Sequence, residues 1–168
     1  KLGVPGEEEF TGKGVSYCAM CDGAFFRDQV VAVVGGGNVA LNDALFLTRF
    51  ASKVIIIHRR DQLRATKILQ DRAFANPKIT FLWDTVVESI IGDKLVREIR
   101  LRNVKTGKGS RLDVSGVFAA VGLRPNTEYL KGLLTLDEGG FILVNGRMET
   151  EVPGIFAGVG VDRDHRRN

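Results

Sequence analysis

The feature that most constrains the fold is a run of three glycines, Gly35-Gly36-Gly37, between a short apolar segment and a helical pattern. Residues 29–34 form an apolar run that is too short for a helix and suits a buried strand. Residues 38–50 then carry leucines at roughly helical spacing, and residues 53–58 are a second, β-branched run. Strand, helix and strand within about thirty residues make a βαβ unit. The sequence therefore predicts an α/β protein with a Rossmann-like domain built on a parallel sheet.

The glycine turn fits the pattern G-x-G-x-x-A of dinucleotide-binding domains, which is specific when it joins a strand to a helix. The first glycine allows the tight turn, the second lets the backbone approach a pyrophosphate, and the small last residue lets the helix pack on the strand. The helix N-terminus offers free N–H groups to the phosphates. The alternative is a glycine-rich turn with no ligand. The predicted cofactor-binding residues of this turn are Gly35, Gly36, Gly37, Asn38 and Ala40.

The end of the second strand indicates which nucleotide is bound. NAD enzymes usually carry an acidic residue there, which accepts a hydrogen bond from the ribose 2′-OH. This chain instead has His58-Arg59-Arg60, and Arg64 follows one helical turn later. A carboxylate would repel a 2′-phosphate, whereas guanidinium groups bind it bidentately. We therefore expect NADPH rather than NADH, with all four residues at the site; a basic, solvated strand end is the alternative.

The only two cysteines form a Cys-x-x-Cys motif, Cys18 to Cys21, just before the nucleotide-binding strand. Two cysteines in one motif do not make the disulfide framework of a secreted scaffold. Near a βαβ unit this motif favours redox chemistry, in which the pair forms and opens a small disulfide loop. The neighbouring Asp22 could carry a proton to or from a departing thiolate.

Two other interpretations of the cysteine pair are weaker. A structural zinc site needs four ligands, and the rest of the chain supplies only His58 and His165 as histidines. We therefore predict no metal site. Alternatively, both cysteines could simply be small buried apolar residues.

The remaining pattern predicts a second helix over residues 63–75 and then an antiparallel meander. Beyond residue 126 the chain is glycine-rich, with short predicted strands at residues 141–144 and 154–157 and too little apolar sequence for a second core. The predicted divisions are a linker over 1–14, an NADPH-binding domain with the cysteines over 15–125, and a separate segment over 126–168. The strands expected in the middle of the chain are 79–83, 86–91, 96–104, 111–114 and 116–121.

Charge and hydropathy exclude several classes of protein. The net charge is +4, but the basic residues are spread along the chain apart from the arginines above and the end of the chain, so we expect no nucleic-acid partner. The apolar runs are too short to cross a bilayer, and the first residues read as polar loop rather than signal peptide. We expect no membrane partner and a cytoplasmic location. Because the chain begins with Lys1 instead of Met, we also expect a piece of a longer protein.

Taken together, five segments resemble the low-molecular-weight, bacterial-type thioredoxin reductases. The resemblance implies a two-domain flavoprotein, usually a homodimer, in which NADPH reduces FAD, the flavin reduces the Cys18–Cys21 disulfide, and the dithiol reduces thioredoxin. It also implies that Asp22 is the acid–base residue and that Gly122 belongs to the cofactor-binding residues. The segments are Val-Ser-Tyr-Cys-Ala-Met-Cys-Asp-Gly (15–23), Val-Ala-Val-Val-Gly-Gly-Gly-Asn (31–38), Ile-His-Arg-Arg-Asp-Gln-Leu-Arg-Ala (57–65), Val-Gly-Leu-Arg-Pro-Asn-Thr (121–127) and Val-Pro-Gly-Ile-Phe-Ala (152–157).

The chain departs from the family pattern in three places. Asn42-Asp43 replaces the usual Glu-Glu pair, and Gly-Val-Gly-Val-Asp (158–162) stands where Ala-x-Gly-Asp would supply an Asp to the flavin. The first glycine fingerprint for FAD is missing. We therefore interpret residues 126–168 as a partial FAD-domain segment and expect this chain alone to bind FAD poorly.

Two alternative functions remain open. The chain could be an isolated NADPH-binding module without independent catalysis. It could also be a relative of the flavoprotein that reduces the alkyl hydroperoxide system, which shares Cys-x-x-Cys-Asp-Gly. That family typically prefers NADH and lacks the His-Arg-Arg sequence, so the arginines favour thioredoxin reductase.

Overall fold

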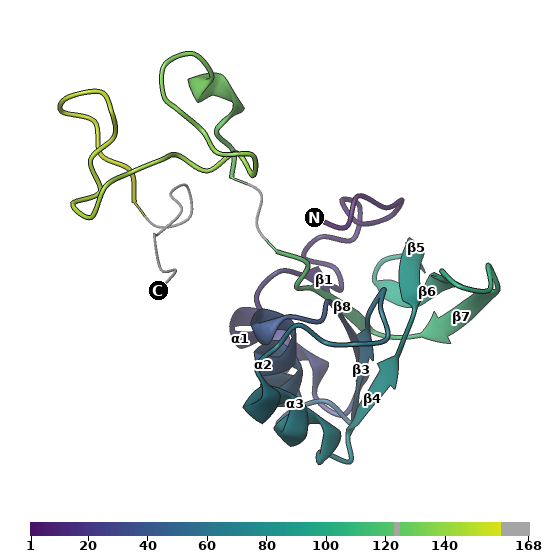
Figure 1. Ribbon diagram of the computed structural model, residues 1–168. Helices are drawn as coiled ribbons and strands as arrows, with labels where there is room; N and C mark the ends of the chain where they lie inside the picture. Colours follow the sequence, from purple (N-terminus) through teal and green to yellow (C-terminus); the bar gives the residue numbers. More distant parts are fainter. Residues whose placement is uncertain (123–124, 159–168) are drawn as a thin grey trace. The chain divides into compact units, whose positions relative to one another are not determined.

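The computed structural model describes residues 1–122 and 125–158, and its contacts divide the chain into two units, 1–121 and 122–168. The first unit contains a five-stranded parallel sheet in the order β1-β8-β2-β3-β4 and an antiparallel sheet in the order β5-β6-β7 (Figure 1). The predicted α/β fold class is confirmed. The elements are β1 (Val15–Ser16), α1 (Ala19–Asp22), the 3-10 helix η1 (Gly23–Phe26), β2 (Val30–Val34), α2 (Asn38–Leu47), β3 (Lys53–Ile57), α3 (Lys67–Phe74), β4 (Ile79–Leu82), β5 (Thr85–Gly92), β6 (Val96–Asn103), β7 (Gly109–Asp113) and β8 (Gly116–Ala119).

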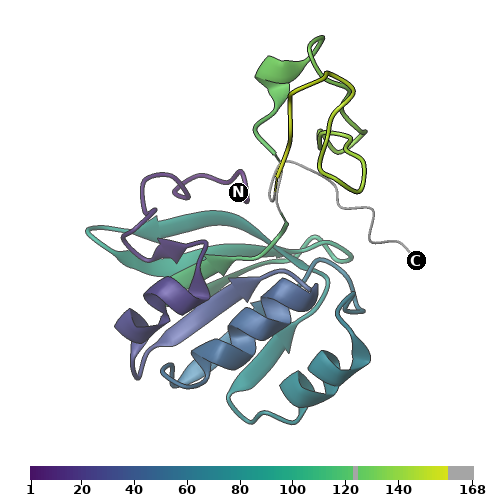
Figure 2. The same cartoon turned by 90° about the vertical axis from the view of Figure 1, so that its left-hand side faces the viewer.

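Apart from Lys53 at the start of β3, the central strands are apolar, because both faces of the parallel sheet are buried. Side chains alternate between the faces of a strand. Val31 and Val33 of β2 join the core on the helical side, whereas Ala32 and Val34 join the core on the other side. Figures 1 and 2 show α1, α2 and α3 against one face and the β5-β6-β7 sheet against the other.

The register of the central strands positions the site. β2 and β3 run in parallel, and their last residues, Val34 and Ile57, lie opposite each other. The turns that follow the two strands therefore start side by side at the carboxyl edge of the sheet. This edge is where open α/β sheets bind their ligands.

The second predicted helix is shorter than expected. The sequence pattern predicts a helix over residues 63–75, but α3 begins at Lys67 and ends at Phe74. The backbone N–H groups of Arg64 and Ala65 both donate to the carbonyl oxygen of Gly36 instead of to a helical partner. These two hydrogen bonds to the glycine turn take the place of the helical hydrogen bonds that the predicted first turn would make.

One predicted strand belongs to a different sheet. Residues 79–83 are expected in the antiparallel meander, but β4 pairs in parallel with β3, Val54 opposite Ile79, and forms the edge of the main sheet. The expectation was wrong because the short stretch before β5 reads like a hairpin turn. In the structure Asp84 takes a left-handed conformation there (φ 52°), and the chain crosses to the second sheet. The rest of the meander, β5-β6-β7, is antiparallel as predicted.

Residues 1–14, expected as a linker, belong to the first unit and pack onto the rest of it. Phe10 is buried in the core that the antiparallel sheet covers. Glu7 is 1% exposed, and its carboxylate accepts hydrogen bonds from the N–H groups of Leu2 and Gly3, both at 2.7 Å, and from the Tyr17 hydroxyl at 2.9 Å. This buried carboxylate ties the start of the chain to the residue that precedes Cys18.

The described part of the second unit, which is Gly122 and residues 125–158, contains one short 3-10 helix, η2 (Glu128–Leu130). The strands predicted at 141–144 and 154–157 do not form there, because each run makes only one isolated bridge, Leu136 to Ile142 and Glu149 to Phe156. A small apolar cluster nevertheless packs around Leu134, Ile142 and Ala157, although too little apolar sequence for a core was expected.

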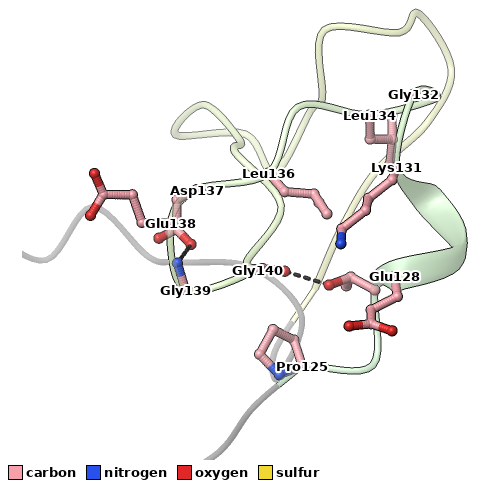
Figure 3. Close-up of a pocket in the computed structure, with 11 residues that line it drawn as sticks. Pro125, Glu128, Lys131, Gly132, Leu134, Leu136, Asp137, Glu138, Gly139 and Gly140 are labelled. Carbon is pink, nitrogen blue, oxygen red and sulfur yellow. Dashed lines mark hydrogen bonds between the residues drawn. The ribbon is translucent and has the colours of Figure 1, made fainter.

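A hollow of about 490 Å³ lies in this second unit. Figure 3 shows the side chain of Lys131 pointing into the hollow from the end of η2, near the side chain of Leu136. The hydroxyl of Thr127 donates to the carbonyl oxygen of Gly140 and closes the loop that forms one wall. None of the predicted site residues lines this hollow.

Candidate functional site: a glycine turn, an arginine hollow and a disulfide

The glycine turn joins β2 to α2, as predicted, and its first residue fits only as glycine. Gly35 has a φ of 151°, and a Cβ at this position would lie 2.4 Å from the carbonyl oxygen of Ala120 and 2.9 Å from the Cβ of Ala40. Ala40 is fully buried. A small residue at position 40 therefore lets α2 approach the sheet closely, which is the role that the sequence pattern assigns to it.

Gly36 and Gly37 differ in what surrounds them. A Cβ on Gly36 would lie 2.4 Å from the His58 ring, whereas a Cβ on Gly37 would have nothing within 4 Å. Gly37 is the N-cap of α2, and no side chain caps that helix terminus. The ten-residue helix thus presents backbone N–H groups to open space, which suits a phosphate.

His58 lies beneath the turn. Its ring is 5% exposed and packs against Gly36, and its Nε2 lies 3.0 Å from the carbonyl oxygen of Gln62. Burial lowers the pKa of His58 below its ordinary value of 6.5, and the nearby arginine charges act in the same direction, against the hydrogen bond with Gln62. The imidazole is therefore neutral at pH 7, with Nε2–H as the donor to the carbonyl. It supports the glycine turn from below.

The arginines form the wall of a second hollow, of about 380 Å³. All three side chains are exposed, and none is ion-paired to another residue in the described part of the chain. An anion could therefore meet three uncompensated guanidinium groups there. The residues that line this hollow are Arg59, Arg60, Asp61, Gln62, Leu63, Arg64, Asp84, Val104 and Lys105.

Backbone hydrogen bonds join the arginine segment to the glycine turn. The N–H groups of Arg64 and Ala65 donate to the carbonyl oxygen of Gly36 at 2.7 and 3.2 Å. One residue further on, the N–H of Thr66 donates to Oδ1 of Asn38 at 2.8 Å. The two predicted halves of the nucleotide site are therefore one connected structure.

The two cysteines form a disulfide, with 5.3 Å between their Cα atoms. Cys18 is the N-cap of α1; its Sγ accepts the N–H of Cys21 at 3.2 Å, and its own N–H donates to Ser16 Oγ at 3.0 Å. Cys21 is exposed and Cys18 half-buried. Asp22 is also half-buried, and its carboxylate has no hydrogen-bond or ion-pair partner among the described residues.

The disulfide and the arginine hollow are at different places in the unit. Gly23, at the end of α1, adjoins Leu47 and Phe46 in the last turn of α2, whereas the glycine turn precedes the first turn of the same helix. Figure 2 shows α1 beside α2, away from the glycine turn. The structure brings the turn and the arginines together but does not bring the cysteines to them.

Three charged residues of the hollow, Lys105, Asp61 and Asp84, were not predicted as site residues from the sequence. Lys105 was interpreted only as part of a hairpin turn, and Asp61 and Asp84 received no role. Of the predicted residues, Gly122 has a φ of 103° and open space around it, and Leu123 and Arg124 of the same segment lie outside the described residues.

No three His, Cys, Asp or Glu side chains gather as a metal-binding group in residues 1–122 and 125–158. No helix of those residues is long and apolar enough to span a bilayer.

Comparison with known proteins decides the family. A family model described as pyridine nucleotide-disulphide oxidoreductase matches residues 1–161. The chain belongs to this family. The family name agrees with two features of the first unit, a glycine turn of the dinucleotide-binding type and a disulfide.

Individual relatives confirm the resemblance to thioredoxin reductases. The chain is 51% identical over 169 residues to the thioredoxin reductase of Streptomyces coelicolor and 54% identical over 168 residues to that of Mycolicibacterium smegmatis, in each case over 99% of the chain. It spans only 52% and 54% of those proteins, about half their length. The crystal structure of Lactococcus lactis thioredoxin reductase matches at 48% identity with a TM-score of 0.91, over 100% of this chain and 56% of that one.

Proposed function

We propose that this chain is the NADPH-binding, disulfide-bearing part of a thioredoxin reductase. One observation carries the proposal. Backbone hydrogen bonds join the open glycine turn to a hollow whose arginine side chains form no ion pair with other described residues. Both lie in the same compact unit as the Cys18–Cys21 disulfide. In this proposal residues 15–125 are the NADPH-binding domain, residues 1–14 lead into it, and residues 126–168 are part of an FAD domain.

The residues of the turn fit the nucleotide. The open space over Gly37 and the uncapped N-terminus of α2 would hold the pyrophosphate, with Gly35, Gly36, Asn38 and Ala40 shaping the turn. Arg59, Arg60 and Arg64 would bind the 2′-phosphate, and His58 would support the turn. When bound, NADPH supplies a hydride. Gly122 is included among the cofactor-binding residues on the family resemblance.

The disulfide is the proposed electron acceptor of the chain. It takes up two electrons and two protons and becomes the Cys18–Cys21 dithiol. A thiolate of the pair then attacks a disulfide of the substrate, and the second cysteine releases the reduced substrate while the Cys18–Cys21 bond forms again. The carboxylate of Asp22, next to Cys21, is the proposed proton carrier.

The whole protein's partners follow from the same proposal. Its substrate would be thioredoxin, its working form a homodimer and its location the cytoplasm, with no nucleic-acid or membrane partner. FAD would mediate between nucleotide and disulfide, as expected from their separation along α2. The described residues contain only one glycine turn of the dinucleotide type, and it is assigned to NADPH.

The alternative function is an NADPH-binding module without independent catalysis. The same separation of disulfide and hollow favours it for the chain by itself. A visible absorption spectrum of the purified chain distinguishes the two. A bound flavin that is bleached by NADPH contradicts the module.

Nucleotide affinity tests the proposal directly. Trp83 is the only tryptophan; it directly precedes Asp84, which lines the hollow, and its ring lies 6.5 Å from that of His58 beneath the glycine turn, so its fluorescence is the chosen probe of binding. We expect NADPH to bind more tightly than NADH. Because each charge-assisted hydrogen bond contributes about 1.5–3 kcal/mol, Arg59→Ala combined with Arg60→Ala weakens NADPH binding by about 100-fold or more.

The matched control is Arg100→Ala combined with Arg111→Ala. These two exposed arginines lie opposite each other on β6 and β7. Their substitution removes the same amount of positive charge, but outside the arginine hollow. Equal loss of NADPH affinity in both double variants would contradict the arginine site. A chain that binds neither nucleotide would contradict the proposed function.

A further inference from the structure

Lys105 lies at the edge of the arginine hollow and holds two carboxylates. Its Nζ lies 2.9 Å from Oδ2 of Asp61 and 3.0 Å from Oδ2 of Asp84. Asp61 directly follows Arg60 in the chain, and both aspartates line the same hollow as the arginines. The proposed phosphate site thus contains two negative charges next to its positive ones.

The local structure fixes Lys105 in this position. Oδ1 of Asn103 accepts the N–H groups of Lys105 and Thr106 at 3.0 and 2.9 Å, which shapes the turn between β6 and β7. The turn is also attached to the hollow, because the N–H of Val104 donates to the carbonyl oxygen of Asp84 at 2.6 Å. The N–H of Asp84 in turn donates to the carbonyl oxygen of Arg60 at 3.3 Å. Backbone hydrogen bonds therefore connect the lysine's turn to the arginine segment.

The charges decide what Lys105 does for a bound anion. The Asp84 side chain is only 16% exposed, so water screens its charge poorly. The hydrogen bond from Lys105 lowers the pKa of Asp61, and the hydrogen bond to Asp61 raises the pKa of Lys105, so both are charged at pH 7. Without the lysine, two carboxylates would repel a 2′-phosphate that carries up to two negative charges.

We propose that Lys105 is a specificity-determining residue for the 2′-phosphate, which acts by neutralising Asp61 and Asp84 beside the arginines. The inference rests on the proposed binding of NADPH and adds to it. The arginines attract the phosphate, and the lysine prevents the neighbouring aspartates from opposing them. The lysine acts through the aspartates because its ammonium group is already bound to both.

The test compares two ligands that differ only in the 2′-phosphate, adenosine 2′,5′-bisphosphate and adenosine 5′-monophosphate, by calorimetry on the full chain. Lys105→Met should weaken binding of the bisphosphate by about three- to tenfold, since two charges a few Å away become unbalanced. Binding of the monophosphate should change much less. Lys108→Met is the matched control, because Lys108 is exposed in the same hairpin and forms no ion pair within the described residues.

A third variant separates neutralisation from direct contact. In Lys105→Met combined with Asp61→Asn and Asp84→Asn, affinity for the bisphosphate should return to the original value or above it; Asn also tolerates the left-handed backbone of position 84. The inference is overturned if Lys105→Met behaves like Lys108→Met, or if the triple variant stays as weak as Lys105→Met. If the unsubstituted chain does not bind the bisphosphate more tightly than the monophosphate, the proposed function itself fails. Circular dichroism of each variant confirms the fold.

Discussion

At the scale of single residues, Gly36 and Gly37 are adjacent but have opposite surroundings. A methyl group on Gly36 would collide with the buried His58 ring, whereas one on Gly37 would enter the space proposed for the pyrophosphate. We expect Gly36→Ala to lower the free energy of unfolding by about 1–3 kcal/mol, as overpacking does. Gly37→Ala should leave that free energy nearly unchanged and abolish tight NADPH binding. Urea unfolding and the Trp83 fluorescence titration measure the two effects.

Each variant is the control for the other. If the turn only connected β2 to α2, Gly37→Ala would bind NADPH normally. A loss of stability in Gly37→Ala as large as that in Gly36→Ala would contradict the open space above Gly37.

Glu7 gives a prediction with a defined pH dependence. Burial raises its pKa, but the hydrogen bonds from Leu2, Gly3 and Tyr17 outweigh this effect and hold the pKa below its ordinary value of 4.5. Because the pKa is lowered in the folded state, the carboxylate's contribution to stability is fully present above about pH 4.5 and is lost as the pH falls through the folded-state pKa.

We therefore expect Glu7→Gln to destabilise the chain by about 1–3 kcal/mol at pH 7, since the amide nitrogen cannot accept the N–H that a carboxylate oxygen accepts. The difference from the unsubstituted chain should shrink below pH 4.5. Urea unfolding at several pH values measures it. Glu9→Gln, an exposed neighbour, should have almost no effect at any pH. If the difference in the free energy of unfolding between Glu7→Gln and the unsubstituted chain stayed constant across this pH range, the lowered pKa of Glu7 would be contradicted.

What the sequence predicts for single residues depends on how local the chemistry is. The glycine turn and the group of arginines could each be found, because the residues within each motif are close together in the chain. Lys105 could not, because its partner Asp61 is 44 residues away. The burial of His58 was also missed. Its position between Ile57 and two arginines does not reveal that its ring turns inward toward Gly36.

At the scale of elements, the βαβ unit was predictable because its strands are apolar on both faces and its helix has a regular pattern. The start of α3 and the sheet of β4 were not, because they depend on distant partners. The carbonyl oxygen of Gly36 takes the N–H groups that would open the predicted helix, and β3 takes β4 as its parallel neighbour. Tertiary hydrogen bonds, which a periodic pattern does not contain, decide both.

The attachment of the arginine segment to α2 leads to a prediction for Asn38. Its Oδ1 accepts the N–H of Thr66, which occupies the N-cap position of α3. Asn38→Ala removes one exposed hydrogen bond, so the free energy of unfolding should fall by about 0.5–1.5 kcal/mol. NADPH binding should weaken about three- to tenfold, because a less fixed segment must be ordered when the arginines bind. Calorimetric titration with NADPH measures the second effect.

Asn42→Ala provides the comparison, because Asn42 is exposed on the same helix and has no hydrogen bond to another described residue. It should bind NADPH as the unsubstituted chain does. If both asparagine variants lose the same affinity, the attachment to Thr66 has no part in positioning the arginines.

At the scale of the whole molecule, the first unit contains two groups that the proposed reaction links, the glycine turn and the disulfide, and they lie apart from each other. The glycine turn is at the start of α2, and the helix that carries the disulfide adjoins the end of α2. A ten-residue helix is about 15 Å long, well beyond the contact that hydride transfer needs. The resemblance to thioredoxin reductases offers an explanation for this arrangement, in which a flavin would carry electrons from the nucleotide to the disulfide. The separation makes the proposed flavin a requirement for the reaction, beyond what the motifs alone indicate.

This arrangement predicts that NADPH alone does not open the Cys18–Cys21 bond of the flavin-free chain. The number of free thiols after incubation with excess NADPH should remain near zero per chain, because the hollow proposed to bind the nucleotide and the disulfide are separate. A small dithiol reductant should release two thiols per chain, which shows that the exposed Cys21 is accessible. The Arg59→Ala, Arg60→Ala variant should give the same two results, since the disulfide does not depend on the hollow. Two thiols per chain after NADPH alone would mean that nucleotide and disulfide meet directly, and the proposed role of the flavin would be wrong.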